Sequence, residues 1–196
     1  MFFRKISCGD AKLVRWIDVV LSLIGLLLLA PLLGLILIML LFESRSPIFR
    51  QIRVGKDKME FVMLKFRSMR CDTKEVSTHL VDSKAITPIG KILRRSKLDE
   101  LPQLWNVFKG DMSFVGPRPG LPNQPELIAQ REIRGIFRVR PGITGLAQIS
   151  KVDMSDPEHL AELDAEMLYS FSVGNYFKYI GLTILGKSKR DQFPEI

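Results

Sequence analysis

The sequence predicts a small α/β protein that is attached to a membrane by a helix near its N-terminus. Three observations lead to this fold class. A run of 24 residues without a charge, 19–42, precedes the polar part of the chain. Apolar residues on both sides of a Gly-Lys-Asp turn predict a short β-hairpin over 48–66. Several later segments carry apolar residues at helical spacing, and 196 residues suit one domain with appendages.

The apolar run is long enough to cross a membrane or to turn back inside it. As a helix rising about 1.5 Å per residue, it could span a hydrocarbon core of about 30 Å. Basic residues flank both ends, among them Arg15 and Arg45, and basic flanks favour the cytoplasmic side. Pro31, in the middle, removes a helix hydrogen bond and favours a kink. These signals fit a re-entrant hairpin, but alone they slightly favour a kinked helix that spans the membrane.

The first half of the polar part predicts a hairpin, a loop and two helices. Strands are expected around Gly55-Lys56-Asp57, followed by a polar surface loop over 70–86. Thr87 and Pro88 predict the cap and first position of a short helix. Apolar residues at helical spacing over 101–108 predict the next helix, which Gly110 ends. Asp99 is its expected N-cap, because Pro102 is tolerated only in the first turn.

The second half predicts mostly helices joined by turns. The expected elements are an extended, proline-rich segment over 113–122, a basic helix over 126–137, a Gly/Pro turn with a short apolar run over 138–150, a helix over 153–172 capped by Asp156 or Ser155, and an amphipathic helix from Val173. The last helix carries aromatics and lysines, a pattern suited to a membrane interface.

The charge balance limits the partners. The chain has 29 Lys and Arg against 21 Asp and Glu, a net charge of +8, which predicts nucleic acid, an anionic membrane or a phosphorylated substrate. No helix-turn-helix, zinc-finger or RNA-binding motif is present, so nucleic acid is not expected. Cys8, Cys71 and the two histidines lack metal-ligand spacing, which argues against a zinc site and a disulfide framework.

An acidic pair, Asp99-Glu100, lies among basic residues. Taken alone, the pair is most simply a helix cap followed by a dipole-favoured glutamate. The surrounding segment 84–151, however, contains 12 basic residues against 5 acidic ones. Arg118 is held between two prolines and Arg140 precedes Pro141, so both lose little backbone entropy when their planar forks bind a phosphate. A phosphate site and a solvated basic face are equally good interpretations of this pattern.

Three linked segments resemble the monotopic phosphoglycosyl transferase family, the small bacterial initiating sugar transferases. They are KFRSM, RRSKLDELPQLWNVFKGDMSFVGPRP and VRPGITGLAQ, and the resemblance runs from Lys12 to Gly186. It implies a re-entrant membrane helix-break-helix over 1–45 and a cytoplasmic catalytic domain with amphipathic interfacial helices over 46–196. The implied location is the cytoplasmic face of the bacterial inner membrane. No large multi-helix region precedes the apolar run, which predicts the minimal catalytic form.

The resemblance also implies an activity. The family transfers a sugar 1-phosphate from a UDP-sugar to undecaprenyl phosphate and releases UMP, by way of a covalent Asp-phosphosugar intermediate and with Mg²⁺. The reaction initiates synthesis of O-antigen, capsule, exopolysaccharide or glycoprotein. An NGRN-like continuation typical of the diacetylbacillosamine branch is missing after Gln148, so a different N-acetylated hexose is expected. The implied partners are the UDP-sugar, undecaprenyl phosphate and membrane lipid, with a homodimer as a further expectation.

Individual residues carry these implied roles. Asp99 would be the nucleophile and a magnesium ligand, with Glu100 as its partner. Arg94 matches a phosphate-binding arginine. The other implied substrate-binding residues are Lys65, Arg67, Arg118, Pro119, Arg140 and Gln148. The membrane break falls at Ala30-Pro31, where the family commonly has Ser-Pro, so no serine hydroxyl is present here to satisfy the freed backbone.

Two other functions fit the residues themselves. One is a membrane-anchored adaptor whose basic face binds anionic lipid or protein. The other is a phosphohydrolase that uses Asp99 on a small phosphate ester. The adaptor would tolerate Asp99→Asn, whereas either enzyme would not, and dependence on polyprenol phosphate separates the transferase from the hydrolase.

Overall fold

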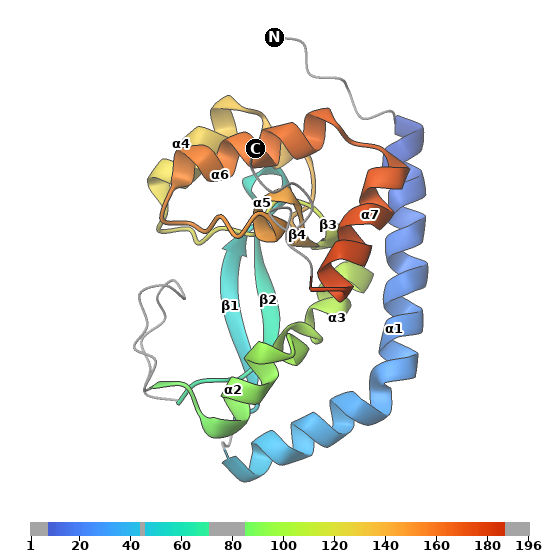
Figure 1. The fold of residues 1–196 in the computed structure, drawn as a ribbon, viewed down its shortest axis with the longest axis vertical. Coiled ribbons are helices and arrows are strands. Elements are labelled where there is room, and N and C mark those ends of the chain that lie inside the picture. Colours follow the sequence, from blue (N-terminus) through green and yellow to red (C-terminus); the bar gives the residue numbers. More distant parts are fainter. Residues whose placement is uncertain (1–7, 44–45, 71–84, 187–196) are drawn as a thin grey trace, which may run out of the picture.

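A long helix, α1 (Cys8–Glu43), runs along one side of a small domain of short helices and two short sheets (Figure 1). The structure is a computed structural model and describes residues 8–43, 46–70 and 85–186. This mixture of helices and strands agrees with the predicted α/β class. The predicted polar loop over 70–86 falls almost entirely outside the described residues.

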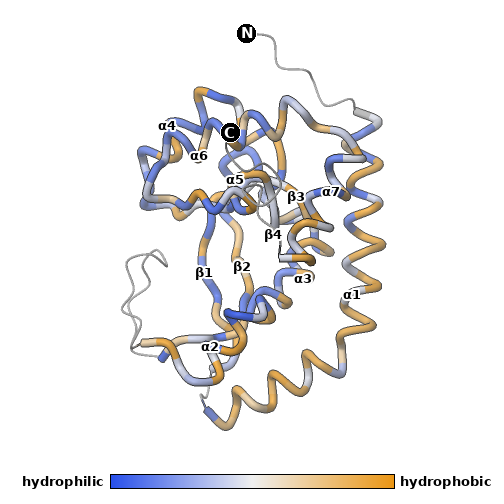
Figure 2. Tube along the Cα trace, in the orientation of Figure 1, coloured by the Kyte–Doolittle hydropathy of each residue, from blue (hydrophilic) through white to orange (hydrophobic). Residues whose placement is uncertain are grey.

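Helix α1 is the predicted membrane segment. It has 36 residues with Pro31 inside, and its ribbon bends so that the second part runs beneath the domain (Figure 1). A proline within a helix accounts for such a bend, because it removes one hydrogen bond. Within the described ranges, this is the one helix long and apolar enough to cross a membrane. Only 11% of its most apolar stretch is buried against the rest of the protein. Figure 2 shows that hydrophobic residues make up most of this helix, and many of them are exposed, which distinguishes it from the core helix of a globular domain.

The first part of α1 is fixed to the domain by Asp18. This side chain is only 1% exposed. Its Oδ1 accepts hydrogen bonds from Ser113 Oγ at 3.0 Å, from the Phe114 N–H at 3.1 Å and from the Tyr176 hydroxyl at 2.6 Å. A buried carboxylate is tolerated here because it has three donors.

The second part of α1 is fixed by an apolar cluster. Its buried members are Ile36, Leu40, Phe66 and Leu93. At the end of the helix, Thr87 Oγ1 donates to Glu43 Oε2 at 3.0 Å. Both ends of α1 therefore contact the same domain.

The predicted hairpin is confirmed. Strand β1 (Ile48–Val54) pairs antiparallel with β2 (Glu60–Phe66), from Ile48 opposite Phe66 to Val54 opposite Glu60. The connection contains the short 3₁₀ turn η1 (Lys56–Lys58).

The helices after the hairpin begin differently from one another. Helix α2 (Pro88–Arg95) has the predicted cap, since Thr87 Oγ1 accepts from the Gly90 N–H at 3.0 Å. Helix α3 (Gln103–Lys109) ends, as predicted, at Gly110, whose φ is +103°. The prediction that Asp99 caps α3 is wrong. Lys97 adopts a left-handed conformation with φ +58° and starts a 3₁₀ turn, η4 (Leu98–Glu100), so Asp99 lies inside that turn.

Helix α3 is packed between α1 and the hairpin. Asn106 bonds to the backbone of β2 on both sides of Met63, accepting from the Leu64 N–H at 3.0 Å and donating to the Val62 carbonyl at 2.7 Å. From α1, Arg15 donates to two carbonyls at the end of α3 at 2.6 and 2.7 Å. Both contacts satisfy polar groups that burial would otherwise leave unpaired.

The second half contains a sheet that sequence reasoning did not foresee. Strand β3 (Ser113–Val115) pairs in parallel with β4 (Gly142–Thr144). The remaining elements are α4 (Pro125–Ile133), η5 (Ile136–Arg138), α5 (Leu146–Ile149), α6 (Pro157–Tyr169) and α7 (Val173–Ile184). Helix α6 is capped by Asp156, one of its two predicted caps, through the His159 N–H at 3.1 Å.

Two glycines allow the chains at this sheet to approach closely. A Cβ at Gly116 would lie 2.4 Å from the Arg140 carbonyl oxygen, and one at Gly142 would lie 2.0 Å from the Gly116 nitrogen. No side chain fits at these distances. The close approach brings the Pro-Arg-Pro loop beside the GITGLAQ segment.

We expect Asp18→Ala to destabilise the protein by about 3 kcal/mol, because three donors at a buried position lose their shared acceptor. Thermal unfolding in detergent micelles measures the effect. Asp10→Ala is the matched control, since Asp10 is exposed on the same helix. Equal melting temperatures for the two variants would show that Asp18 does not fix α1 to the domain.

Candidate active site

The acidic pair lies against the hairpin. Asp99, in η4, is 9% exposed. The Nζ of Lys65, from β2, lies 2.7 Å from Oε1 of the half-buried Glu100. This ion pair forms because Asn106 docks α3 on β2, which carries the preceding turn to the end of the strand.

The pKa values of the two adjacent carboxyl groups are shifted in opposite directions. Burial raises the pKa of Asp99 above its ordinary value; Lys65 opposes this, Glu100 adds to it and Arg94 again opposes it. Burial acts in the same direction on Glu100, but Lys65 and then Arg118 outweigh it and lower its pKa. Environments that shift the pKa values of two neighbouring carboxyl groups in opposite directions are typical of sites where the two groups have different roles.

Asp99 receives no side-chain hydrogen bond from any described residue, whereas Glu100 is bonded to Lys65. Among those residues no group of three His, Cys, Asp or Glu gathers as a metal cage. Mg²⁺ does not need one, because it is commonly bound by one or two carboxylates together with substrate phosphates and water. The carboxylate of Asp99 therefore fits a magnesium ion that is shared with a phosphorylated substrate.

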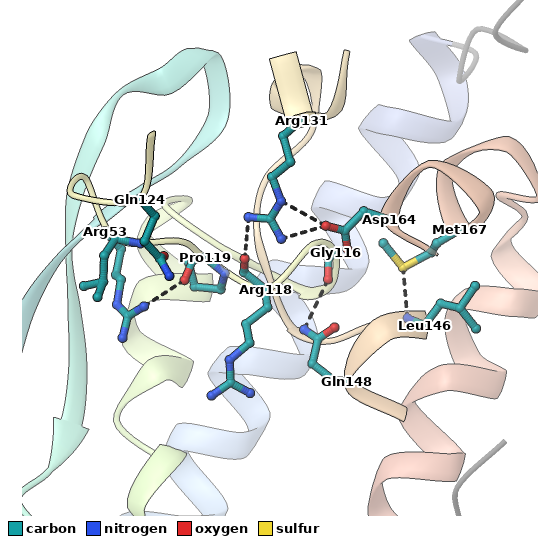
Figure 3. A network of polar contacts seen from close by, with 11 residues as sticks. Arg53, Gly116, Arg118, Pro119, Gln124, Arg131, Leu146, Gln148, Asp164 and Met167 are labelled. Atoms are coloured by element: carbon teal, nitrogen blue, oxygen red, sulfur yellow. Dashed lines mark hydrogen bonds and ion pairs between the residues drawn. The ribbon is translucent and has the colours of Figure 1, made fainter. Parts of the chain in front are cut away.

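Arg118 has a fixed backbone and an unengaged side chain. Figure 3 shows its carbonyl accepting from Arg131, and the carbonyl of Pro119 accepting from Arg53. Within the described part of the chain, no hydrogen bond or ion pair is made by the guanidinium of Arg118. The positive charge of Arg118 nevertheless lowers the pKa of Glu100. This arrangement is expected of an arginine whose guanidinium binds an anionic ligand.

Two further predicted residues are placed close to these groups. Arg94 donates from Nε to Ser68 Oγ at 2.8 Å and acts electrostatically on Asp99. Gln148 donates from Nε2 to the Gly116 carbonyl at 3.4 Å, while its buried Oε1 has no partner among the described residues.

Arg67 and Arg140 are bonded elsewhere. Arg67 donates to the Ser46 carbonyl at 2.7 Å, and its guanidinium carbon lies 5.5 Å from the centre of the Phe49 ring. Arg140 donates to the Gly110 carbonyl at 2.7 Å, at the opposite end of α3 from the acidic turn. The structure brings neither into contact with Asp99. Lys65, inside β2, and Arg67, just after it, have different partners.

Four polar residues of this region were missed by sequence reasoning: Arg53, Asn106, Arg131 and Asp164, all less than 10% exposed. Two of them could have been found in the sequence, because they lie on the apolar face of a helix. Arg131 follows the buried Leu127 by four residues, and Asp164 follows the buried Leu160 by four. A charge at such a position requires a buried partner.

We expect opposite stability effects at the acidic pair. Asp99→Asn should leave the melting temperature at pH 7 unchanged or higher, because folding raises the pKa of Asp99 and its ionised form therefore opposes folding at neutral pH. Glu100→Gln should destabilise by about 1 kcal/mol, because it removes a charged hydrogen-bond acceptor from Lys65.

The lowered pKa of Glu100 adds a pH dependence. Its stabilising contribution is complete above the pKa of the unfolded carboxyl and is lost as the pH falls through the folded value. The difference in unfolding free energy between wild type and Glu100→Gln should thus shrink in acid. Melting curves from pH 3 to 8 measure it; a larger loss for Asp99→Asn than for Glu100→Gln would contradict this assignment.

Comparison with known proteins assigns the chain to a family. A family model described as "Bacterial sugar transferase" matches residues 10–189. The chain is 36% identical to a galactosyl transferase of Streptococcus agalactiae (94% of this chain, 43% of the relative). It is 39% identical to a UDP-glucose:undecaprenyl-phosphate glucose-1-phosphate transferase of Escherichia coli (94% and 42%). It is 36% identical to a UDP-N-acetylgalactosamine-undecaprenyl-phosphate N-acetylgalactosaminephosphotransferase of Aeromonas hydrophila (83% and 40%).

The chain thus spans less than half the length of these three relatives. The family model, in contrast, is matched along nearly the whole chain, including the acidic pair and the Pro-Arg-Pro loop. This match confirms the resemblance that the three linked motifs indicate, and the chain belongs to the bacterial sugar transferase family.

Proposed function

We propose that the protein transfers a sugar 1-phosphate from a UDP-sugar to undecaprenyl phosphate and releases UMP, as the first step of glycoconjugate synthesis. The observation that carries the proposal is the buried carboxylate of Asp99, which has no side-chain donor among the described residues although Lys65, Arg94 and Arg118 surround the acidic pair. The names of the E. coli and A. hydrophila relatives, both undecaprenyl-phosphate transferases, support the substrate class.

The reaction takes two displacements at one phosphorus. An oxygen of Asp99 attacks the phosphate that bears the sugar, the phosphoanhydride bond to UMP breaks, and a sugar-phosphoryl-Asp99 intermediate forms. An oxygen of the lipid phosphate then attacks the same phosphorus, the bond to Asp99 breaks, and the carboxylate is regenerated. Covalent catalysis of this kind divides one difficult transfer into two easier ones.

The chain's own cations would make these attacks feasible. A carboxylate approaches a phosphate only where the negative charge is neutralised, and Lys65, Arg94 and Arg118 supply positive charge around the acidic pair. Glu100 would orient Lys65 through their ion pair. Mg²⁺, bound by the Asp99 carboxylate and substrate phosphates, would supply further neutralisation of the phosphate oxygens.

The sugar stays a prediction. The relatives are named for galactosyl, glucose and N-acetylgalactosamine transfer, so they include both plain and N-acetylated hexoses. An N-acetylated hexose remains our expectation for this chain, as does a homodimer.

The packing of α1 supports a re-entrant helix at the cytoplasmic face of the inner membrane. Asp18 and Glu43 both contact the same domain, yet as a straight helix they would be about 37 Å apart, more than a hydrocarbon core of about 30 Å. A straight spanning helix would place them on opposite sides of the membrane. A helix bent at Pro31, dipping into one leaflet, keeps both ends on one side.

The exposed apolar side chains support the same orientation. On α1 they include Leu27, Leu28 and Phe42. On α7, which lies beside the first part of α1 (Figure 1), Phe177 and Ile184 are exposed. An amphipathic helix with such a face binds well at a lipid interface.

Topology can be measured with single cysteines at Asp10 and Arg50, both exposed, in a variant that lacks Cys8 and Cys71. A membrane-impermeant maleimide should label both positions in inside-out vesicles and neither in intact spheroplasts. Labelling of the Asp10→Cys variant from the outside would establish a spanning helix.

Activity can be measured as UMP release from a panel of UDP-sugars, with undecaprenyl phosphate and Mg²⁺ in detergent. We expect turnover with at least one sugar, and a loss of roughly 1,000-fold or more in Asp99→Asn. Asp57→Asn, on the exposed η1 turn, is the control. Retention of most activity by Asp99→Asn would exclude this function, and multiple turnover without lipid would identify a hydrolase instead.

A further inference from the structure

The Pro-Arg-Pro loop is held by two buried arginines that bond to consecutive carbonyls. Arg131 donates from Nη1 to the Arg118 carbonyl at 2.8 Å, and Arg53 donates from Nη1 to the Pro119 carbonyl at 3.0 Å (Figure 3). The two come from different elements, α4 and β1. The loop is therefore fixed to two parts of the fold that lie far apart in sequence.

A third consecutive carbonyl is also bonded. The N–H of Val54 donates to the Gly120 carbonyl at 3.0 Å. This bond belongs to an antiparallel bridge between the end of β1 and Gly120, whereas the carbonyls of Arg118 and Pro119 are bonded by side chains. Three successive bonds to one short loop define its backbone far more strictly than its two flanking prolines could alone.

Arg131 is buried for this contact. It is 3% exposed, and its counter-ion Asp164, on α6, is fully buried. Asp164 Oδ2 accepts from Nε of Arg131 at 3.0 Å and from Nη2 at 2.6 Å. A buried ion pair of this kind contributes little net stability, since apolar residues of similar volume often serve as well or better. Stability alone does not explain why the pair is here.

Arg53, like Arg131, is buried and oriented by a side-chain acceptor. It is 8% exposed, and Gln51 Oε1 accepts from its Nε at 3.1 Å and from its Nη2 at 2.5 Å. Burial, with the charge of Arg118 in second place, lowers the pKa of Arg53 to about 10, so it remains charged at neutral pH. Two of its nitrogens thus orient the side chain on Gln51, and the third binds the loop.

We propose that Arg131, with its counter-ion Asp164, and Arg53 are positioning residues, which fix the loop backbone so that the guanidinium of Arg118, without a partner among the described residues, faces the acidic pair. The inference rests on the proposed function, in which Arg118 binds a substrate phosphate. Each buried arginine is oriented by a side chain, Asp164 or Gln51, and gives one hydrogen bond to the loop backbone. The side chain of Arg118 is left for the ligand.

The first test measures the loop itself. Arg131→Met combined with Asp164→Leu replaces the ion pair by apolar residues and should keep the fold. Amide hydrogen exchange of the segment 116–124 should become at least tenfold faster, with the rest of the chain and the melting temperature little changed. The matched control is Arg134→Met with Glu162→Leu, since these two residues form a more exposed ion pair between the C-terminal end of α4 and α6.

The second test measures coupling to Arg118. We expect the double variant to lower kcat/KM for the UDP-sugar roughly 10- to 100-fold, as misplaced catalytic groups do. In an Arg118→Ala background the same two substitutions should cause no further loss. If the double variant does not fold, Arg131→Lys supplies both readouts, because an ammonium cannot reproduce the three directed bonds.

The outcomes are separable. The positioning role would be overturned if amide exchange in 116–124 were unchanged in the double variant. It would also be overturned if the loss of kcat/KM in the double variant added to the loss in Arg118→Ala. In either case the ion pair would be structural. Absence of UMP release by wild type with every UDP-sugar would instead overturn the proposed function, while the exchange measurement would still decide whether the buried arginines order the loop.

Discussion

The short helix α3 is the element on which the rest of the structure depends, and the amide of Asn106 fixes it. The side chain bonds to β2 at Val62 and Leu64, and its backbone carbonyl accepts the N–H groups of the three residues that follow Lys109. On its other side α3 receives Arg15 from α1. The hairpin, the acidic turn and the apolar helix are thereby joined, so the ion pair of Lys65 with Glu100 and the position of Asp99 both follow from this one docking.

The charged residues around the turn divide into two groups. Arg15, Arg53, Arg131 and Arg140 spend hydrogen bonds on backbone carbonyls and hold the fold. Arg118 makes none with the described residues, and Lys65 is bonded to Glu100. Of the two adjacent carboxylates, Glu100 is the one with a cationic partner, while burial opposes ionisation of Asp99. An anionic substrate would thus meet a preformed cationic surface and a carboxylate that has no side-chain donor in the described ranges, which favours transfer chemistry over a purely structural ion pair.

Local patterns in the sequence predicted the hairpin, the cap at Thr87, the stop at Gly110 and the helices α4, α6 and α7, because each depends on neighbouring residues. Contacts between distant residues could not be read in this way. Asp99 was expected to cap α3, but the left-handed Lys97 moves it into a turn. The parallel pair β3–β4 rests on strands of three residues, too short for a periodic signal. The partner of Arg131 lies 33 residues away, and only the structure shows that both ends of α1 contact one domain.

The central claim is that Asp99 is a nucleophile, and the most direct measurement is intact-protein and peptide mass spectrometry after incubation with a UDP-sugar and Mg²⁺ without lipid acceptor. The account predicts a mass increase of one hexose-phosphate, located on the peptide that contains Asp99 and removed when undecaprenyl phosphate is added. An enzyme that consumes UDP-sugar when lipid is present, but never carries this adduct, would contradict the account.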